Sequence, residues 1–136
     1  MSSEKHPEAI LVVEDNPVNA MVTRLMLQRK GFVVEVAENG ARALELLQRA
    51  TFGLVLMDVS MPVMDGLEAT RKIRSGELPG VDATIPVVGL TAHNLTGDKD
   101  EFLEAGMDRV LTKPIEVPDL DALIQQYFGE GEPERE

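Results

Sequence analysis

Five short apolar segments alternate along this 136-residue chain with longer amphipathic stretches. Each segment is rich in aliphatic, mostly β-branched residues and has the length of a strand that is buried on both faces. The segments are residues 9–13, 32–37, 52–57, 85–90 and 109–112, and the remaining stretches predict helices over 17–30, 39–49, 67–74, 96–105 and 116–128. Strands that alternate with helices in this way indicate an α/β fold with a parallel sheet.

The sheet has five predicted strands, and right-handed crossover connections leave few orders for it. We expect the doubly wound, flavodoxin-like order 2-1-3-4-5, with five helices covering both faces and a switch point between the first and third strands. Ligands of such sheets bind at the carboxyl ends of the strands beside that point. The residues that follow the strands are therefore the candidates for function.

Local signals mark individual helices. Asn16 is a typical N-cap, Pro17 suits the first helical position, and Lys30 with Gly31 is a typical helix end. Apolar residues follow Pro17 at helical spacing, as in an amphipathic helix that packs on a sheet: Val18, Met21, Val22, Leu25 and Met26. The basic run Arg71, Lys72 and Arg74 on the third predicted helix indicates a solvated face.

Charge and composition exclude several classes of protein. Acidic residues outnumber basic ones by 24 to 13, for a net charge of −11, which argues against nucleic-acid binding. The absence of cysteine excludes disulfides and thiolate sites. No segment approaches the ~18 apolar residues of a membrane span, and no signal peptide is present, so we expect a cytoplasmic protein without membrane insertion.

Length predicts a single domain. We expect residues 1–7 to form a flexible arm, residues 8–128 to form the domain, and residues 129–136 to form an acidic disordered tail or a linker stub, because that last segment has no apolar residue.

Three carboxylates follow neighbouring strands of the predicted sheet. Glu14 and Asp15 come after the first strand, and Asp58 ends the third. Adjacent strands lie roughly 4.8 Å apart, so these groups crowd together and repel unless a cation neutralises them. Oxygen ligands of this kind suit Mg²⁺. The alternative is that each acid caps a helix or faces solvent; we favour the metal site.

Two further polar residues follow the outer strands. Thr91 ends the fourth strand with a hydroxyl, and Lys113 follows the fifth with a positive charge that suits a phosphate oxygen. Acids, a hydroxyl, a cation and a metal site at one edge are the parts of a phosphoryl-transfer site. Asp58 is the candidate nucleophile, because a carboxylate can form an aspartyl phosphate.

Four segments, in order and at normal spacing, resemble the receiver domain of two-component response regulators over residues 8–128. They are ILVVEDNPVN, LVLMDVSMPVMDGLEATRKIR, IPVVGLTAH and AGMDRVLTKPI. The phrase VEDNPVN is similar to receivers of hybrid kinases and phosphorelays. The resemblance implies the CheY-like form of the doubly wound fold, and it implies that Asp58 accepts a phosphoryl group from a phosphohistidine.

The same resemblance implies roles for the other residues. Asp15, Asp58 and the backbone carbonyl of Ser60 would ligate Mg²⁺, or Mn²⁺ in its place, with Glu14 acting through water. Thr91 and Lys113 would each contact a phosphoryl oxygen, and the bond from Lys113 to Pro114 would be cis, which proline allows at about 0.5–1 kcal/mol.

Two positions depart from the family pattern. Glu14 stands where Asp is frequent, although Glu is common in hybrid-kinase receivers. Val110 stands where the family usually carries Tyr or Phe, which swings inward together with the threonine. We therefore expect an output surface that responds weakly or by another route, with the phosphorylation chemistry intact.

The expected function is a phosphoacceptor signalling module, either a stand-alone regulator or a receiver from a hybrid kinase. Its partner would be a sensor histidine kinase or a histidine-phosphotransfer protein, and pairing into a homodimer fits the family. We expect no enzymatic activity beyond self-catalysed phosphotransfer and autodephosphorylation. Two alternatives stay open: a pseudo-receiver that only binds partners, which predicts a damaged pocket, and a small Mg²⁺-dependent aspartyl-phosphate hydrolase, which lacks an acid at Ser60.

Overall fold

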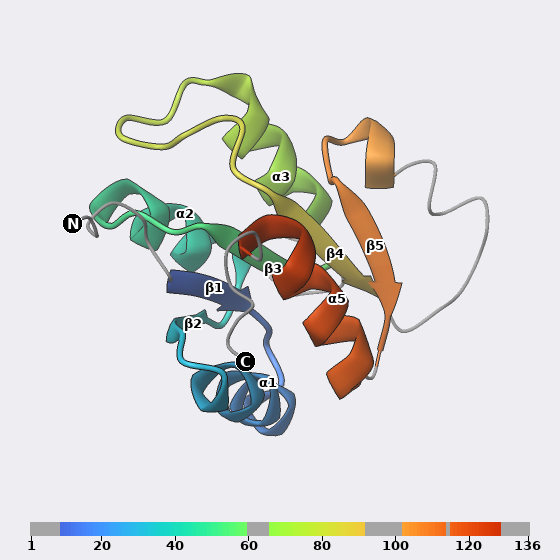
Figure 1. Cartoon of the computed structure of the whole chain (residues 1–136). Helices are drawn as coiled ribbons and strands as arrows, with labels where there is room; N and C mark the ends of the chain where they lie inside the picture. The colour runs from blue at the N-terminus through green and yellow to red at the C-terminus, as the bar shows by residue number, and fades with distance from the viewer. Residues whose placement is uncertain (1–8, 60–65, 92–101, 114, 129–136) are drawn as a thin grey trace.

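A parallel sheet of five strands forms the centre of the molecule (Figure 1). The computed structural model describes residues 9–59, 66–91, 102–113 and 115–128. The strands are β1 (Ala9–Val13), β2 (Val33–Ala37), β3 (Leu54–Asp58), β4 (Val87–Thr91) and β5 (Arg109–Thr112), in the spatial order β2-β1-β3-β4-β5. The predicted order is confirmed, and each strand begins within two residues of its predicted start.

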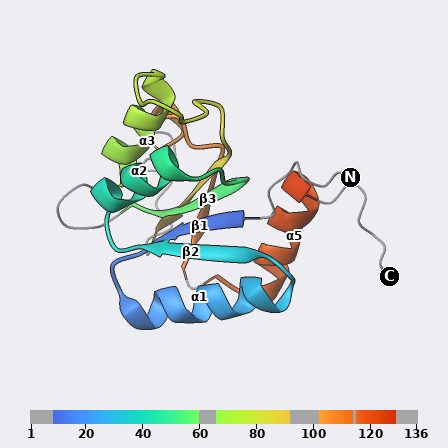
Figure 2. The same ribbon diagram turned by 90° about the vertical axis from the view of Figure 1, so that its left-hand side faces the viewer.

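Helices cover both faces of the sheet (Figure 2). The described helices are α1 (Pro17–Arg29), α2 (Gly40–Arg49), α3 (Gly66–Ser75) and α5 (Val117–Phe128). Helices α1 and α5 pack on one face around Leu27, Leu120 and Leu123, whereas α2 and α3 pack on the other around Leu47 and Ile73. Of the helix expected over 96–105, residues 96–101 lie outside the described residues, and Phe102, Leu103 and Glu104 are helical.

Asparagine side chains fix where two helices begin. The side chain of Asn16 accepts hydrogen bonds from the backbone N–H groups of Val18 and Asn19, at 2.9 and 3.0 Å. Asn39 does the same for Arg42 at 2.8 Å. Both caps follow directly on the loops that leave β1 and β2, so they set the direction in which each helix leaves the sheet.

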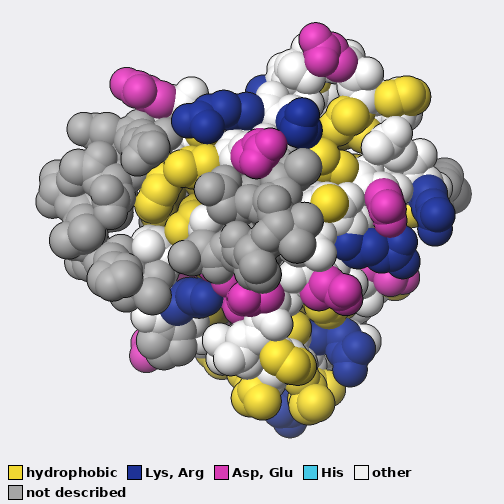
Figure 3. Space-filling model, turned by 180° about the vertical axis from the view of Figure 1, so that it is seen from behind, with side chains coloured by type: hydrophobic (Ala, Val, Ile, Leu, Met, Phe, Trp, Pro, Cys, Tyr) yellow, Lys and Arg dark blue, Asp and Glu magenta, His cyan; other side chains and the backbone are white. Residues whose placement is uncertain are grey.

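The apolar side of α1 does not lie where the sequence pattern predicts. Val18, Met21, Val22 and Leu25 are exposed, with Val18 at 67%, whereas Ala20 and Leu27 are the residues of α1 that are buried. The exposed side chains lie along α1 at the bottom of Figure 3. We call these four residues the α1 apolar stripe. The prediction that they pack on the sheet is wrong for all four, and only Met26 of the predicted set packs against the core.

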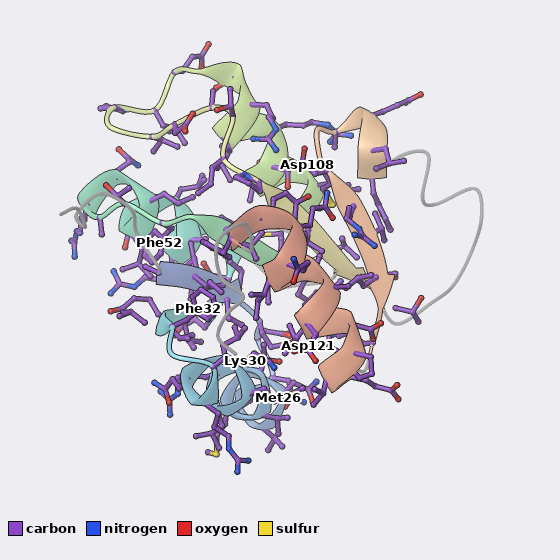
Figure 4. All side chains as sticks on the ribbon, viewed as in Figure 1. Met26, Lys30, Phe32, Phe52, Asp108 and Asp121 are labelled. Atoms are coloured by element: carbon purple, nitrogen blue, oxygen red, sulfur yellow. The ribbon has the colours of Figure 1, made fainter. Side chains whose placement is uncertain are left out.

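The solvated basic face predicted on α3 is also wrong for one residue. Arg71 and Lys72 are exposed, but Arg74 turns toward the sheet, and its guanidinium donates to backbone carbonyls and to Asp108. Asp108 lies at the start of β5 (Figure 4). A basic residue in the last turn of a helix therefore forms part of the interior framework here.

The first and last described elements meet at the amino edge of the sheet, opposite the carboxyl ends of the strands. Ala9 begins β1, and Phe128 at the end of α5 places its ring 4.9 Å from that of Phe32, the residue before β2. An ion pair between Lys30 and Asp121 joins α1 to α5 nearby (Figure 4). No helix in the described part of the chain is long and apolar enough to cross a membrane.

Candidate functional site

Three carboxylates converge at the carboxyl edge of the sheet. Glu14 and Asp15 directly follow β1, and Asp58 is the last residue of β3, the neighbouring strand. One carboxylate oxygen from each residue lies within 4.8 Å of those of the other two. Glu14 and Asp58 are buried, at 5% and 1% exposed, whereas Asp15 is exposed. The cluster therefore has two fixed members and one that opens to solvent.

Lys113 brings a positive charge to the same edge. Its Nζ lies 3.2 Å from Oδ2 of Asp58 and 3.4 Å from Oε1 of Glu14. Its backbone N–H donates to the carbonyl of Thr91 at 2.7 Å, which continues the pairing of β5 with β4. Thr91 is itself 5% exposed. Sheet pairing thus places Lys113 beside carboxylates that lie 55 and 99 positions earlier in the chain.

Charge in this cluster is unbalanced, with three acids to one lysine among the described residues. Burial raises the pKa of Glu14, and the charge of Asp58 raises it further. Burial opposes the charged form of Lys113, but the carboxylates of Asp58 and Glu14 outweigh this effect and raise the pKa of Lys113. The charge of Asp58 therefore contributes to both shifts: it acts together with burial on Glu14 and against burial on Lys113.

The donor set fits a hard divalent cation. All three candidate ligands offer carboxylate oxygen, which Mg²⁺ prefers, and the exposed Asp15 leaves a path for the ion to enter. The alternative was that each acid caps a helix or faces solvent. Asp15 does face solvent but does not cap α1, because Asn16 does, and Glu14 and Asp58 are buried. Glu14 Oε2 does accept a hydrogen bond from the backbone of Asn16, at 3.3 Å. The cluster could therefore hold a metal ion.

A hollow of about 530 Å³ adjoins Lys113. Its wall combines Glu14 with apolar side chains from α1, from β4 and from the segment before α5, among them Val22 of the α1 apolar stripe; the other lining residues are Asn19, Thr23, Leu90 and Ile115. The residues that α1 contributes to this hollow were not predicted as site residues. Their signal is helical spacing, since Asn19 and Val22 follow Asp15 by one and two turns.

Most residues named from the sequence gather at this one edge. The carboxylates of Glu14, Asp15 and Asp58 form one cluster. Lys113 forms ion pairs with two of them, Glu14 and Asp58, and its backbone N–H donates to the carbonyl of Thr91. Ser60 and Pro114 lie outside the described residues. Val110 is partly buried and packs against the core cluster on the α2 and α3 side of the sheet.

Known proteins share this fold and these segments. The model of the response regulator receiver domain matches residues 10–125. The sensor protein GacS of Pseudomonas syringae pv. syringae is 40% identical over 120 residues, a region that covers 88% of this chain and 13% of GacS. The chain therefore spans about one eighth of that relative's length.

Two solved structures are similar in fold and sequence. The receiver domain of the sensor histidine kinase PA1611 from Pseudomonas aeruginosa PAO1, with magnesium in its active-site cleft, is 38% identical with a TM-score of 0.80; the match covers 92% of this chain and all of that one. The receiver domain of Ssk1 from Saccharomyces cerevisiae, solved with the histidine phosphotransfer protein Ypd1, is 30% identical with a TM-score of 0.79, over 88% and 87% of the two chains.

The family match over residues 10–125 includes Glu14, Asp15 and Asp58 of the carboxylate cluster and also Lys113. The matched proteins include receivers that belong to sensor kinases, as the VEDNPVN segment predicts. The chain belongs to the response regulator receiver domain family.

Proposed function

We propose that the chain is a phosphoacceptor module of a phosphorelay, in which Asp58 takes a phosphoryl group from a phosphohistidine. The observation that carries the proposal is the contact of Lys113 Nζ with Asp58 Oδ2, at 3.2 Å, inside a cluster with two further carboxylates. Asp58 is 1% exposed at the end of a buried strand, so its carboxylate is held in one position. The assembled cluster favours this function over a pseudo-receiver.

The reaction is an in-line displacement at phosphorus. A carboxylate oxygen of Asp58 forms the new P–O bond while the P–N bond to the donor imidazole breaks, and the imidazole nitrogen keeps the electron pair. Lys113 exchanges its contact with the Asp58 oxygen for one with a phosphoryl oxygen. The Thr91 hydroxyl donates to a second phosphoryl oxygen. Water later attacks the aspartyl phosphate and releases inorganic phosphate, which restores Asp58.

Magnesium supplies positive charge to the phosphoryl oxygens when it is bound. Asp15 and Asp58 would hold it directly, Glu14 through water, and Ser60 through its backbone carbonyl. Asp15 has the exposure that a ligand of an exchanging ion needs, while Glu14 and Asp58 are buried and fix its position. The two positive charges of a bound Mg²⁺ would offset the negative charge of the carboxylate cluster that Lys113 does not neutralise.

The phosphodonor would dock on α1 beside the site. The α1 apolar stripe exposes four apolar side chains, and it is continuous through Val22 with the hollow next to Lys113. An exposed apolar patch at the rim of a reactive site is typical of a partner surface. A histidine-phosphotransfer protein, of the class that binds the Ssk1 receiver, or the phosphohistidine domain of a sensor kinase is the proposed partner.

The first test uses acetyl phosphate and the intact mass of the full chain. We expect a single phosphoryl adduct that requires Mg²⁺ and that is absent from Asp58→Asn. An adduct in the Asp58→Asn variant would move the acceptor to another residue. No adduct under conditions where Mg²⁺ binds would favour a receiver that only binds partners, or one that accepts phosphate from its own phosphohistidine alone.

A further inference from the structure

The amino end of α3 rests on the backbone of the proposed phosphoacceptor. A Cβ atom on Gly66 would collide with the carbonyl oxygen of Asp58 and would lie 2.9 Å from Cα of Val59. The hydroxyl of Thr70, which is fully buried, donates to the carbonyl of Gly66 at 2.7 Å and closes the first turn. Only glycine allows this approach, so α3 begins in direct backbone contact with Asp58.

The other end of α3 is fixed by Arg74. Its Nη1 donates to the carbonyls of Ala83 and Ile85, at 2.7 and 2.8 Å, in the segment that enters β4. Its Nε donates to the carbonyl of Gly106 at 2.8 Å, and its Nη2 to Asp108 Oδ2 at 3.0 Å. One planar side chain therefore joins α3 to the two segments that lead into β4 and β5.

The turn formed by residues 106–108 is held tightly against its neighbours. A Cβ atom on Gly106 would lie 2.6 Å from Cγ of Arg74. Asp108 exchanges backbone contacts with Val87: its Oδ2 accepts from the Val87 N–H at 2.9 Å, and its own N–H donates to the Val87 carbonyl at 2.8 Å. The side chain of Met107 fills the space above Gly89 in β4, where a Cβ would collide with its sulfur.

We propose that α3 is a rigid strut that carries the phosphorylation state of Asp58 to the turn at residues 106–108. The helix has ten residues, so its ends lie about 15 Å apart. Its inner side is packed through Ala69 and Ile73, which are buried. A shift of the Asp58 backbone therefore moves Gly66, and with it Arg74 and the carbonyl of Gly106, because Gly66 packs closely on the Asp58 carbonyl at one end and the Arg74 guanidinium is hydrogen-bonded to Gly106 at the other.

This proposal rests on the proposed function and adds an output route to it. Val110 has no aromatic ring to follow Thr91, so a signal that depends on such a ring is not available to this chain. The strut begins at the backbone of Asp58 and reaches the start of β5 without passing through Val110. The turn and the start of β5 are then the surface at which a partner would sense phosphorylation.

Amide chemical shifts of the ¹⁵N-labelled full chain test the strut. The probe is beryllofluoride with Mg²⁺, a stable analogue of the phosphoryl group. We expect it to shift the amides of Val59 and Thr91 near the site and those of Met107 and Asp108 at the turn. In Arg74→Met the response at Met107 and Asp108 should fall to less than half, while the response at Val59 remains. Arg71→Met, an exposed residue one turn earlier, is the matched control and should respond like wild type.

Two results would overturn the strut: an unchanged response at Met107 and Asp108 in Arg74→Met, or no response there in the wild type while Val59 responds. No response at Val59 or Thr91 would instead count against the proposed function. If Arg74→Met fails to fold, Asp108→Asn is the second variant, with the amide of Met107 as its reporter. It keeps the shape of the side chain and weakens the hydrogen bond from Arg74 together with the one that the same oxygen accepts from the Val87 N–H. The strut predicts a smaller loss in the same direction, and an unchanged response would overturn it.

Discussion

Two partly buried basic side chains lie at opposite edges of this sheet, and the groups that surround their positive charges differ greatly. Lys113 at the carboxyl edge and Arg74 at the amino edge have side chains that are 21% and 22% exposed, so burial does not distinguish them. Lys113 is a point charge between two buried carboxylates, with Asp15 as a third acid nearby. Arg74 donates four hydrogen bonds, three to backbone carbonyls and one to the carboxylate of Asp108.

The difference separates a site that can react from a framework that cannot. Each guanidinium nitrogen of Arg74 has a hydrogen-bond acceptor, so adding an ion or a phosphate there would break existing bonds. Around Lys113 the negative charge exceeds the positive, and a divalent cation or a rearranged lysine contact lowers the energy. Unbalanced charge around Lys113 therefore marks the carboxyl edge, rather than the amino edge, as the candidate site.

Lys113→Ala should have the largest effect. If Lys113 neutralises the transferring group, the rate at which acetyl phosphate labels Asp58 should fall by about 10²–10³-fold at saturating Mg²⁺. Intact-mass time courses measure this rate, with Lys72→Ala on the exposed side of α3 as the control. A rate within about twofold of wild type would mean that Lys113 does not stabilise the transferring group, and that the two basic residues do not differ in reactivity as proposed.

Arg74→Met should mainly affect stability. The variant loses four hydrogen bonds from a charged donor, so the free energy of unfolding should fall by about 3 kcal/mol. Urea denaturation followed by circular dichroism measures the loss. Arg71→Met should change the same quantity by less than about 0.5 kcal/mol. Equal losses in the two variants would mean that the bonds of Arg74 are no better than solvation by water.

Glu14→Gln should stabilise the protein at neutral pH in the absence of divalent cations, by a few degrees in Tm. The pKa of Glu14 is raised in the folded state, chiefly by burial, so the folded protein binds this proton more tightly than the unfolded chain. The stability that Glu14 contributes is therefore full below its ordinary value of 4.5 and is lost as the pH rises through the raised pKa.

Thermal melts of the wild type and of Glu14→Gln, from acid to neutral pH, test the direction of this stability change. The advantage of Glu14→Gln should disappear below pH 4.5, where wild-type Glu14 is protonated in both states, and added Mg²⁺ should narrow it at neutral pH. An advantage that persists unchanged in acid would show that shape rather than charge distinguishes the two side chains.

Lys30→Met should have the smallest effect and gives a reference for an ion pair in solvent. Lys30 and Asp121 join α1 to α5 with side chains that are 27% and 56% exposed. We expect a loss of less than about 1 kcal/mol in the free energy of unfolding, which high salt should reduce further. A loss as large as that of Arg74→Met would mean that the pairing of α1 with α5 is as critical as the framework at the amino edge.

The sequence was sufficient for the sheet and for the cluster because both depend on short-range patterns. Apolar segments of strand length with helices between them leave few parallel sheets, and the carboxyl ends of parallel strands meet at one edge, which brings Asp58 to Glu14 and Asp15.

The two wrong predictions, for the apolar side of α1 and for Arg74 of α3, both concern what a helix contacts in the folded protein. The periodicity of α1 shows that it has an apolar side, but not that Ala20 and Leu27 face the sheet while Val18 and Met21 face outward. For Arg74 the decisive partners are carbonyls of Ala83, Ile85 and Gly106, and only the folded arrangement brings backbone groups from these loops to one guanidinium. Backbone acceptors leave no trace in the identity of the residues that carry them.

Ala9 and Phe128 both lie at the amino edge of the sheet, which has a consequence for any protein in which this domain is tethered. The described domain begins and ends about 17 Å behind Asp58, the length of a five-residue strand, so the segments that lead to a neighbouring domain start from there. An extended linker covers about 3.5 Å per residue, so about five of its residues are needed to run along the sheet before a neighbouring domain can reach the site. Linker length would then decide whether the phosphoryl group passes within one molecule or between two.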